Sequence, residues 1–234
     1  MIGKFYGIGV GPGDKELLTI KATKILKEID IIICPESVKG KGSIALNICS
    51  EYLKDDVEIL PLTFPMTYDE NVLKKKWKEN SDIIYKKLKS GKDVAFLTLG
   101  DPSVYSTYMY LLPHLKEKDV LINTIPGITS FSSIANNLNI PLATSEETIG
   151  ILPLRKDANK LENFLDNYDN VIIMKPSHAS KKIAEVLIKK GYENNFVMVS
   201  KSGTDKEKVV TDINRLKNEK VPYLSTVIVK KNKI

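Results

Sequence analysis

The sequence predicts an α/β protein of two domains, with a mostly parallel amino-terminal sheet and a mixed carboxyl-terminal sheet. Short apolar runs alternate with amphipathic runs of helical period along most of the chain, which is typical of strand–helix repeats. A length of 234 residues also exceeds one typical domain. We place the boundary in the polar segment 116–119, which gives domains of residues 1–117 and 118–234.

The amino-terminal half begins with an apolar run that enters the glycine turn Gly11-Pro12-Gly13-Asp14 and then an amphipathic helix. A second long helix, with lysines on one face, is expected over residues 72–88. The strands of this half are expected at residues 4–10, 30–34, 57–61 and 93–99.

The last of these strands ends in Gly100-Asp101-Pro102. Gly100 allows a ligand to approach the backbone, and Asp101 with Pro102 is typical of a helix start. Ligands of open α/β sheets bind where parallel strands end, so this turn is the first candidate site. A helix is expected to follow from Tyr105 to Leu115, interrupted or ended near Pro113.

The carboxyl-terminal half is expected to begin with a strand over 120–124 and a second turn over 125–131, which starts a helix of small residues. A further helix is expected over 181–189, ended by Gly191. The remaining strands, some of them antiparallel, are expected at residues 148–152, 171–174, 196–200, 208–211 and 223–230.

Composition narrows the class of partner. The net charge of +6 favours a polyanion. The lysines are spread along the chain without interleaved aromatic residues, so a small polyacid is favoured over nucleic acid. No apolar run is long enough to span a membrane. The spacing of Cys34 and Cys49 fits neither a disulfide framework nor a zinc site, so we expect reduced thiols, no metal site and a cytoplasmic location.

The first glycine turn also bears comparison with the dinucleotide-binding fingerprint. The third glycine of that fingerprint falls on Pro12 when the motif is read from Gly7, and on Asp14 when it is read from Gly9. Glu36 nevertheless lies where a ribose-binding acid is expected. A nicotinamide-dependent oxidoreductase therefore stays open as an alternative on these residues.

Three turn motifs together resemble the tetrapyrrole methylases: Gly9-Val10-Gly11-Pro12-Gly13-Asp14, Gly100-Asp101-Pro102 and Pro126-Gly127-Ile128-Thr129-Ser130. Members of this family are two-domain α/β enzymes that use S-adenosylmethionine to methylate macrocycles. Longer blocks are similar to the branch that methylates C20 of precorrin-2 or cobalt-factor II in cobalamin biosynthesis. These blocks are Pro65-Met66-Thr67 with Trp77, residues 94–107 and residues 125–132.

The resemblance implies an active site in the cleft between the two domains, with S-adenosylmethionine as methyl donor and S-adenosylhomocysteine as product. The cofactor contacts that it implies are Pro12, Gly100, Asp101, Val104, Thr129, Ser130, Met174, Gly203 and Thr226. Three neighbours are added because they adjoin these positions: Tyr105, Ser106 and Phe131. Methyl transfer to an electron-rich carbon needs no protein nucleophile, so no catalytic residue is assigned.

The substrate of this branch is a polycarboxylate, which agrees with the basic composition. Lys39, Lys41 and Arg155 lie in loops expected to border the cleft, and they are our candidates for binding its carboxylates. The abundance of lysine, asparagine and isoleucine suggests an anaerobic source, which favours cobalt-factor II over precorrin-2. His178, a few residues after the strand that ends at Met174, would be the available axial ligand of that metal if it faced the cleft, and is otherwise an ordinary loop residue.

The resemblance further implies a homodimer. Two kinds of alternative remain beside the oxidoreductase. The first is another tetrapyrrole methylase or a diphthamide-type methylase. The second is a macrocycle carrier without enzymatic activity.

Overall fold

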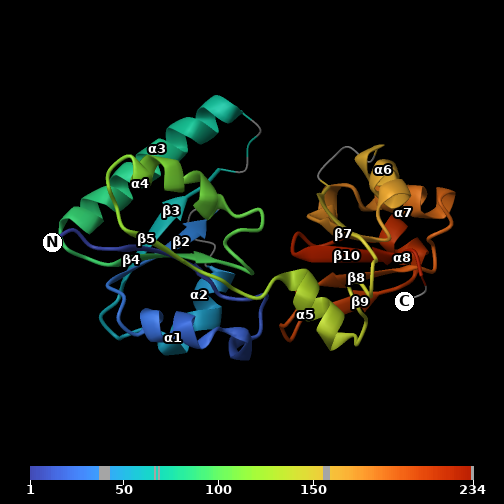
Figure 1. Ribbon diagram of the computed structural model, residues 1–234, viewed down its shortest axis with the longest axis horizontal. Helices are drawn as coiled ribbons and strands as arrows, with labels where there is room; N and C mark the ends of the chain where they lie inside the picture. Colours follow the sequence, from blue (N-terminus) through green and yellow to red (C-terminus); the bar gives the residue numbers. More distant parts are fainter. Residues whose placement is uncertain (37–42, 66, 68, 155–158, 233–234) are drawn as a thin grey trace. The chain divides into compact units, whose positions relative to one another are not determined.

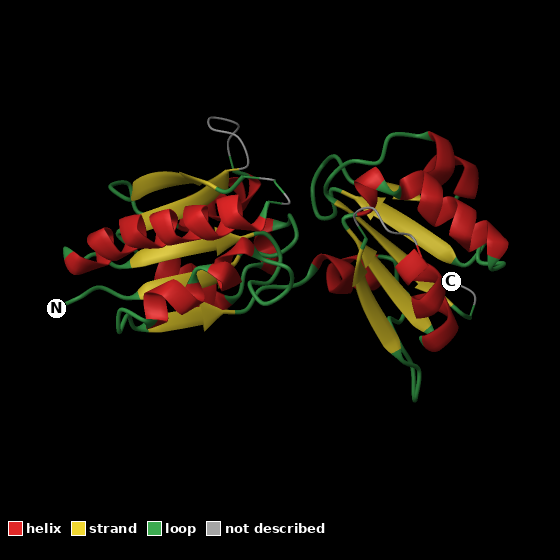
Figure 2. Cartoon of the chain, turned by 90° about the horizontal axis from the view of Figure 1, so that it is seen from above, coloured by secondary structure: helices red, strands yellow, loops and turns green. Residues whose placement is uncertain are grey.

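The computed structural model describes residues 1–36, 43–65, 67, 69–154 and 159–232. The chain forms two compact units, Met1–Thr129 and Ser130–Ile234. Each unit contains one five-stranded sheet with helices packed on both faces (Figures 1 and 2). The predicted α/β class is therefore confirmed.

The sheet of the first unit is wholly parallel, with the strand order β3-β2-β4-β1-β5. Its strands are β1 (Phe5–Gly9), β2 (Ile31–Glu36), β3 (Glu58–Thr63), β4 (Val94–Thr98) and β5 (Ile122–Ile125). The α-helices are α1 (Ile20–Leu26), α2 (Ile44–Cys49), α3 (Glu70–Lys89) and α4 (Leu112–Lys116). The described residues of this unit also form the short 3₁₀ helices η1 (Lys15–Leu17), η2 (Ser50–Tyr52) and η3 (Thr107–Tyr110).

Strand β2 shows why the apolar runs of this unit are continuous. Ile31 and Ile33 pack toward α3 and α4, whereas Ile32 packs on the opposite face toward α1 and α2. Side chains alternate along a strand, so a sheet covered on both faces needs apolar residues at every position. Figure 1 shows these two helical layers above and below the sheet. Cys34 and Cys49 lie buried in the α1–α2 layer without a disulfide.

The sheet of the second unit is mixed, with the strand order β6-β7-β10-β8-β9. Its strands are β6 (Ile149–Pro153), β7 (Asn170–Met174), β8 (Phe196–Ser200), β9 (Lys208–Val210) and β10 (Ser225–Lys230). The helices are α5 (Ser130–Asn137), α6 (Asn159–Asn167), η4 (Pro176–His178), α7 (Ser180–Lys189) and α8 (Ile213–Asn218). Strand β10 is antiparallel to both β7 and β8, so it begins at the edge where those two strands end.

The division between the units differs from the expected boundary at 117/118. Strand β5 pairs in parallel with β1 and completes the first sheet, and the first unit extends to Thr129. The polar segment 116–119 ends α4 inside that unit, and Asp119 adopts the left-handed conformation there at φ 52°. A charged segment after a helix is thus a helix end in this chain rather than a linker.

The helix expected over residues 105–115 is also different in the structure. The chain forms η3 and then the short α4, and Pro113 lies in the first turn of α4 instead of interrupting a longer helix. Proline is well tolerated there because the first turn of a helix has no intrahelical acceptor for its missing N–H. Helices α6 and α8 were not anticipated. In the described part of the chain, no helix has both the length and the apolar composition to cross a membrane.

Candidate active site

The loops after β1, β4 and β5 meet at the carboxyl edge of the first sheet. Gly100 N donates to the Gly11 carbonyl at 2.7 Å, and Gly11 N donates back to the Gly100 carbonyl at 3.3 Å. Val10 N donates to the Thr98 carbonyl at 2.9 Å, so the loops after β1 and β4 stay paired beyond the ends of their strands. The buried Pro12 follows directly in this paired segment.

Glycine is required where these loops touch. A Cβ on Gly127 would lie 2.2 Å from the Gly100 carbonyl oxygen, and one on Gly9 would lie 2.6 Å from Gly127 N. Gly100 is different, because its φ of +77° favours glycine while the nearest atom to its Cβ position is the Ile128 carbonyl oxygen at 3.9 Å. The Gly100 backbone is therefore open on the side where a side chain would otherwise stand, as the resemblance implies for a cofactor contact.

Asp101 fastens the β4 loop to the β5 loop. Its Oδ2 accepts a hydrogen bond from Gly127 N at 2.9 Å, and its Oδ1 accepts from Ser103 N at 2.8 Å and from the Ser103 hydroxyl. No helix begins at Pro102, because residues 102–105 form turns and bends. The helix-capping role expected for Asp101 is thus wrong: the carboxylate stabilises a turn and holds two loops together.

Ser106 and Tyr105 follow in the same loop with contrasting environments. The Ser106 hydroxyl lies 3.1 Å from the Thr98 hydroxyl and accepts from Tyr108 N at 3.1 Å, so it is a buried cap of η3. Tyr105 is 44% exposed and adopts a φ of 50°, which is uncommon for an aromatic residue. Partial burial raises the pKa of its phenol. Val104 is half-buried, and its N–H donates to the Asp101 carbonyl at 3.2 Å.

Three of the expected residues of the second unit come together at the edge where β10 begins. Ser130, at the start of α5, has its hydroxyl 3.1 Å from that of Thr226 on β10. Thr226 is 4% exposed and pairs directly with Met174, the last residue of β7. Helix α5 and strands β7 and β10 therefore present two hydroxyls and a thioether side by side, with the half-buried Phe131 next along α5.

The turn after β8 lies at the same edge, since β7 and β8 both end where β10 begins. Gly203 adopts a φ of 74° there and donates its N–H to the Glu207 carboxylate at 2.8 Å. Beside it, the Ser202 hydroxyl is buried with no hydrogen-bond partner in the described residues. Thr129 is half-buried at the end of the first unit.

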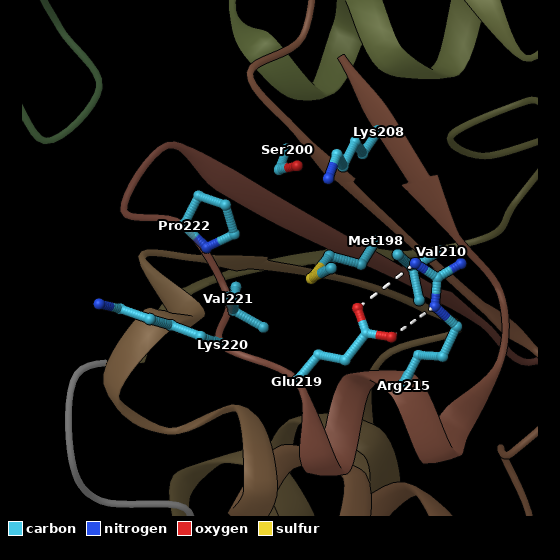
Figure 3. Close-up of a pocket in the computed structure, with 9 residues that line it drawn as sticks. All are labelled: Met198, Ser200, Lys208, Val210, Arg215, Glu219, Lys220, Val221 and Pro222. Carbon is cyan, nitrogen blue, oxygen red and sulfur yellow. Dashed lines mark hydrogen bonds and ion pairs between the residues drawn. The ribbon is translucent and has the colours of Figure 1, made fainter. Parts of the chain in front are cut away.

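Several candidates are not placed with these groups. Lys39, Lys41 and Arg155 lie outside the described residues. His178 is exposed in η4, four residues after the end of β7. A pocket in the second unit contains none of the expected residues, and the Arg215–Glu219 ion pair at 2.9 Å forms one wall (Figure 3). Its lining is Met198, Ser200, Lys208, Val210, Arg215, Glu219, Lys220, Val221 and Pro222.

Comparison with known proteins gives full-length relatives. The chain is 41% identical to a probable cobalt-precorrin-2 C(20)-methyltransferase of Methanocaldococcus jannaschii, covering 100% of this chain and 98% of the relative. It is 30% identical to the cobalt-precorrin-2 C(20)-methyltransferase of Salmonella typhimurium, covering 99% and 98% respectively.

The fold has solved counterparts as well. The structure of uroporphyrin-III C-methyl transferase from Thermus thermophilus, complexed with S-adenosylhomocysteine, superposes with a TM-score of 0.71. The two proteins are 20% identical, and the match covers 98% of this chain and 92% of the other. The model of the family called tetrapyrrole (corrin/porphyrin) methylases matches residues 4–217. From its sequence relatives and this family match, the chain belongs to the tetrapyrrole methylases.

Proposed function

We propose that this protein transfers a methyl group from S-adenosylmethionine to C20 of cobalt-factor II or precorrin-2 in cobalamin biosynthesis, and releases S-adenosylhomocysteine. The main support is the 41% identity, over the whole chain, to a probable cobalt-precorrin-2 C(20)-methyltransferase. The structural counterpart that was solved with S-adenosylhomocysteine supports the choice of methyl donor.

The residues present fit this cofactor chemically. S-adenosylmethionine combines a flat adenine, ribose hydroxyls and an amino acid, and such a ligand suits an apolar surface with a few polar groups. The first unit offers the open backbone of Gly100, and the second offers the Ser130 and Thr226 hydroxyls beside Met174. We propose as its contacts Pro12, Gly100, Val104, Tyr105, Thr129, Ser130, Phe131, Met174, Gly203 and Thr226.

Asp101 and Ser106 remain in the proposed site as positioning residues. Asp101 holds the Gly100 loop against Gly127, and Ser106 fixes the end of the same loop on Thr98. Both side chains use hydrogen bonds to the protein, so they act by holding the cofactor-contacting backbone in place. Their loss should therefore weaken cofactor binding and lower thermal stability together.

When bound, the cofactor supplies a methyl group that is already activated for transfer. The macrocycle carbon supplies the electrons, so the chain's own residues have to bind and orient the two molecules. Positioning of this kind is worth about 7–11 kcal/mol of a reaction barrier. On this view no triad or metal is required of the protein, and the residue that removes the C20 proton is not assigned.

We further propose that the protein is a cytoplasmic homodimer and that Lys39, Lys41 and Arg155 contribute to binding the substrate carboxylates. The two relatives named for cobalt-precorrin-2 support a preference for the metallated substrate. Cobalt-factor II should accordingly be methylated faster than precorrin-2. The turnover of both should fall as salt concentration rises, because salt screens contacts between lysines and carboxylates.

The test combines binding and turnover. S-adenosylhomocysteine should bind in a calorimetric titration, whereas nicotinamide dinucleotides should give no heat. Isotopically labelled S-adenosylmethionine is then incubated with each macrocycle, and NMR locates the new methyl group. A methyl group at a carbon other than C20 would contradict the branch assignment. Dinucleotide binding without a response to S-adenosylhomocysteine would overturn the proposed function altogether.

A further inference from the structure

Positive φ values at residues other than glycine single out one edge of the second unit. In the described part of the chain such residues are Tyr105, Asp119, Asn139, Ser145, Lys175 and Lys201. Asp119 and Asn139 follow the ends of α4 and α5, where a left-handed residue commonly closes a helix. Ser145 lies in the turn closed by the bond from Glu147 N to the Thr144 carbonyl at 3.0 Å. Tyr105 already belongs to the proposed site.

Lys175 and Lys201 differ from these residues in their place in the sheet. Lys175 directly follows the last residue of β7 and Lys201 directly follows that of β8, with φ values of 59° and 52°. Neither residue closes an α-helix. Lys175 also precedes Pro176, a position that normally favours an extended conformation.

The surrounding backbone holds Lys201 in this conformation. Its N–H donates to the Leu224 carbonyl at 2.8 Å, and its own carbonyl accepts from Thr204 N at 3.2 Å and from the Thr204 hydroxyl at 2.8 Å. The Lys201 side chain is exposed, and no carboxylate of a described residue lies within ion-pair distance of its amine. A fixed backbone thus carries a lysine whose charge is not used within the described structure.

A left-handed residue other than glycine costs about 1–2 kcal/mol. The chain does use glycine for the same conformation nearby, at Gly203 with φ 74°. A lysine kept at two such positions indicates that its side chain is needed, because strain of this kind tends to persist at binding sites. The feature needed at these positions is one that lysine has and glycine lacks, namely a long side chain that ends in a positive charge.

Both lysines flank the start of β10, where Thr226 pairs with Met174 on one side and with Val199 on the other. Two strand spacings separate β7 from β8, so the lysine backbones stand roughly 10 Å apart. This spacing suits a ligand with several separated carboxylates better than a ligand with one. The edge also holds Ser130, Met174 and Thr226, which are proposed contacts of the methyl donor.

We propose that Lys175 and Lys201 bind carboxylate groups of the macrocyclic substrate. This inference rests on the proposed function, because it assumes that a polycarboxylate macrocycle binds at this edge. The carboxylate on the methionyl group of S-adenosylmethionine is the other carboxylate that these lysines would bind. The measurements below separate these two sources.

The test replaces each lysine by glycine, which removes the charge and relieves the backbone strain. Both variants should stay folded, and Lys201→Gly should keep the melting temperature of the parent or raise it. They should weaken binding of a porphyrin polycarboxylate, followed by fluorescence titration, about tenfold each. KM for the macrocycle that accepts the methyl group should rise to the same extent, with little change in kcat. The dissociation constant of S-adenosylhomocysteine, measured by calorimetry, should not change.

Two controls match the two parts of the substitution. Asn139→Gly relieves a left-handed residue, φ 54°, without removing a charge. Lys189→Ala removes an exposed lysine at the far end of α7, where it pairs with Glu162. Both controls should bind the porphyrin polycarboxylate like the parent protein.

Unchanged porphyrin binding in both lysine variants would overturn the inference. Weaker S-adenosylhomocysteine binding with unchanged porphyrin binding would also overturn it and assign the lysines to the cofactor carboxylate. The porphyrin titration does not require turnover. If the parent protein binds the porphyrin but methylates neither macrocycle, the proposed function fails while the lysine variants still decide this inference.

Discussion

The two sheet edges that carry the proposed cofactor contacts are held together by different kinds of contact. In the first unit, the loops after β1, β4 and β5 touch through their backbones, and glycine at positions 9 and 127 allows that contact. In the second unit, side chains make the connection, as between the Ser130 and Thr226 hydroxyls. The contact at the first edge therefore depends on glycines that lack a side chain. The contact at the second edge depends on hydrogen bonds between side chains.

This difference predicts unequal tolerance to substitution. A backbone contact at van der Waals distance leaves no room for even a methyl group, because neither partner can rotate away. Where two hydroxyls make the contact, a shorter or apolar side chain fits in nearly the same space, and the substitution removes one hydrogen bond. Substitutions should thus be costly at the first edge and mild at the second.

Gly127→Ala should have the largest effect. Its new Cβ would lie 2.2 Å from the Gly100 carbonyl oxygen and 2.8 Å from the Gly9 carbonyl carbon, so the loops have to separate. We expect a loss of about 3 kcal/mol of unfolding free energy, together with loss of S-adenosylhomocysteine binding. Thermal denaturation and calorimetry measure the two effects.

Gly191→Ala is the matched control for that variant. Gly191 follows helix α7 with a φ of 76°, and nothing lies within 4 Å of its Cβ position. The control should lose only the strain of a left-handed alanine, about 1 kcal/mol, and should bind S-adenosylhomocysteine normally. Equal melting temperatures for the two variants would contradict the backbone-contact account of the first edge.

Asp101→Ala comes next, because it removes the carboxylate that bonds the β4 loop to the β5 loop. Gly127 N and Ser103 N would both lose their acceptor. We expect a loss of about 2 kcal/mol in stability and a clear weakening of S-adenosylhomocysteine binding, both measured on the same preparation. Ser103→Ala removes only the hydroxyl donor and should cost much less. If Asp101→Ala melts like Ser103→Ala, the bond to Gly127 does not hold the loops together.

The first sheet was predictable because its strands are buried on both faces and read as continuous apolar runs, of which residues 31–34 are the clearest. The sequence did not predict that β5 belongs to this sheet. Its four residues Ile122–Ile125 include only one buried side chain, so they carry no signal for the sheet that they join. Pairing with β1 decides the matter, and pairing is a long-range property.

The candidate site was predictable to a similar depth. The glycine-rich turns locate the first edge, since ligands of parallel sheets bind where strands end, whereas the residues of the second edge came from the family resemblance. The role of Asp101 was not predictable, because an aspartate that caps a helix and one that stabilises a turn occupy the same kind of sequence. Lys175 and Lys201 carry no signal at all. Their left-handed backbones are properties of the folded turns and leave no mark in the sequence.

A third prediction concerns the opposite end of β10, where side-chain hydrogen bonds again connect the strand to its neighbours. Lys230 is 3% exposed, and its amine donates to Asn170 Oδ1 and to the Pro141 carbonyl, both at 2.9 Å. The Glu147 carboxylate lies 3.7 Å from that amine. Hydrogen bonds from Thr144 N and from the Asn170 and Asn232 side chains lower the pKa of Glu147 to about 2.

Because this pKa is lower in the folded than in the unfolded protein, the carboxylate stabilises the fold at pH values above its ordinary pKa of 4.5. That contribution should decline as pH falls from 4.5 toward 2. Glu147→Gln should therefore melt below the parent at neutral pH, and the difference should shrink on acidification. Melting temperatures recorded across this range test the prediction, and a difference that stays constant with pH would refute it.

The smallest effect is expected from Ser130→Ala. The variant removes one hydroxyl from a single 3.1 Å contact and leaves Thr226 buried with one partner fewer. A hydrogen bond of this kind contributes about 1 kcal/mol, so the melting temperature should fall by only a few degrees.

A double-mutant cycle with Thr226→Val separates this bond from other losses. If the two hydroxyls stabilise the second edge through each other, the double variant should lose less stability than the sum of the two single variants. S-adenosylhomocysteine binding should weaken in each single variant, because both hydroxyls are proposed cofactor contacts. Strictly additive losses would show that the pair is not coupled. In that case the second edge depends on the packing of α5 against β10 rather than on this contact, and the difference between the two edges is smaller than their hydrogen bonds indicate.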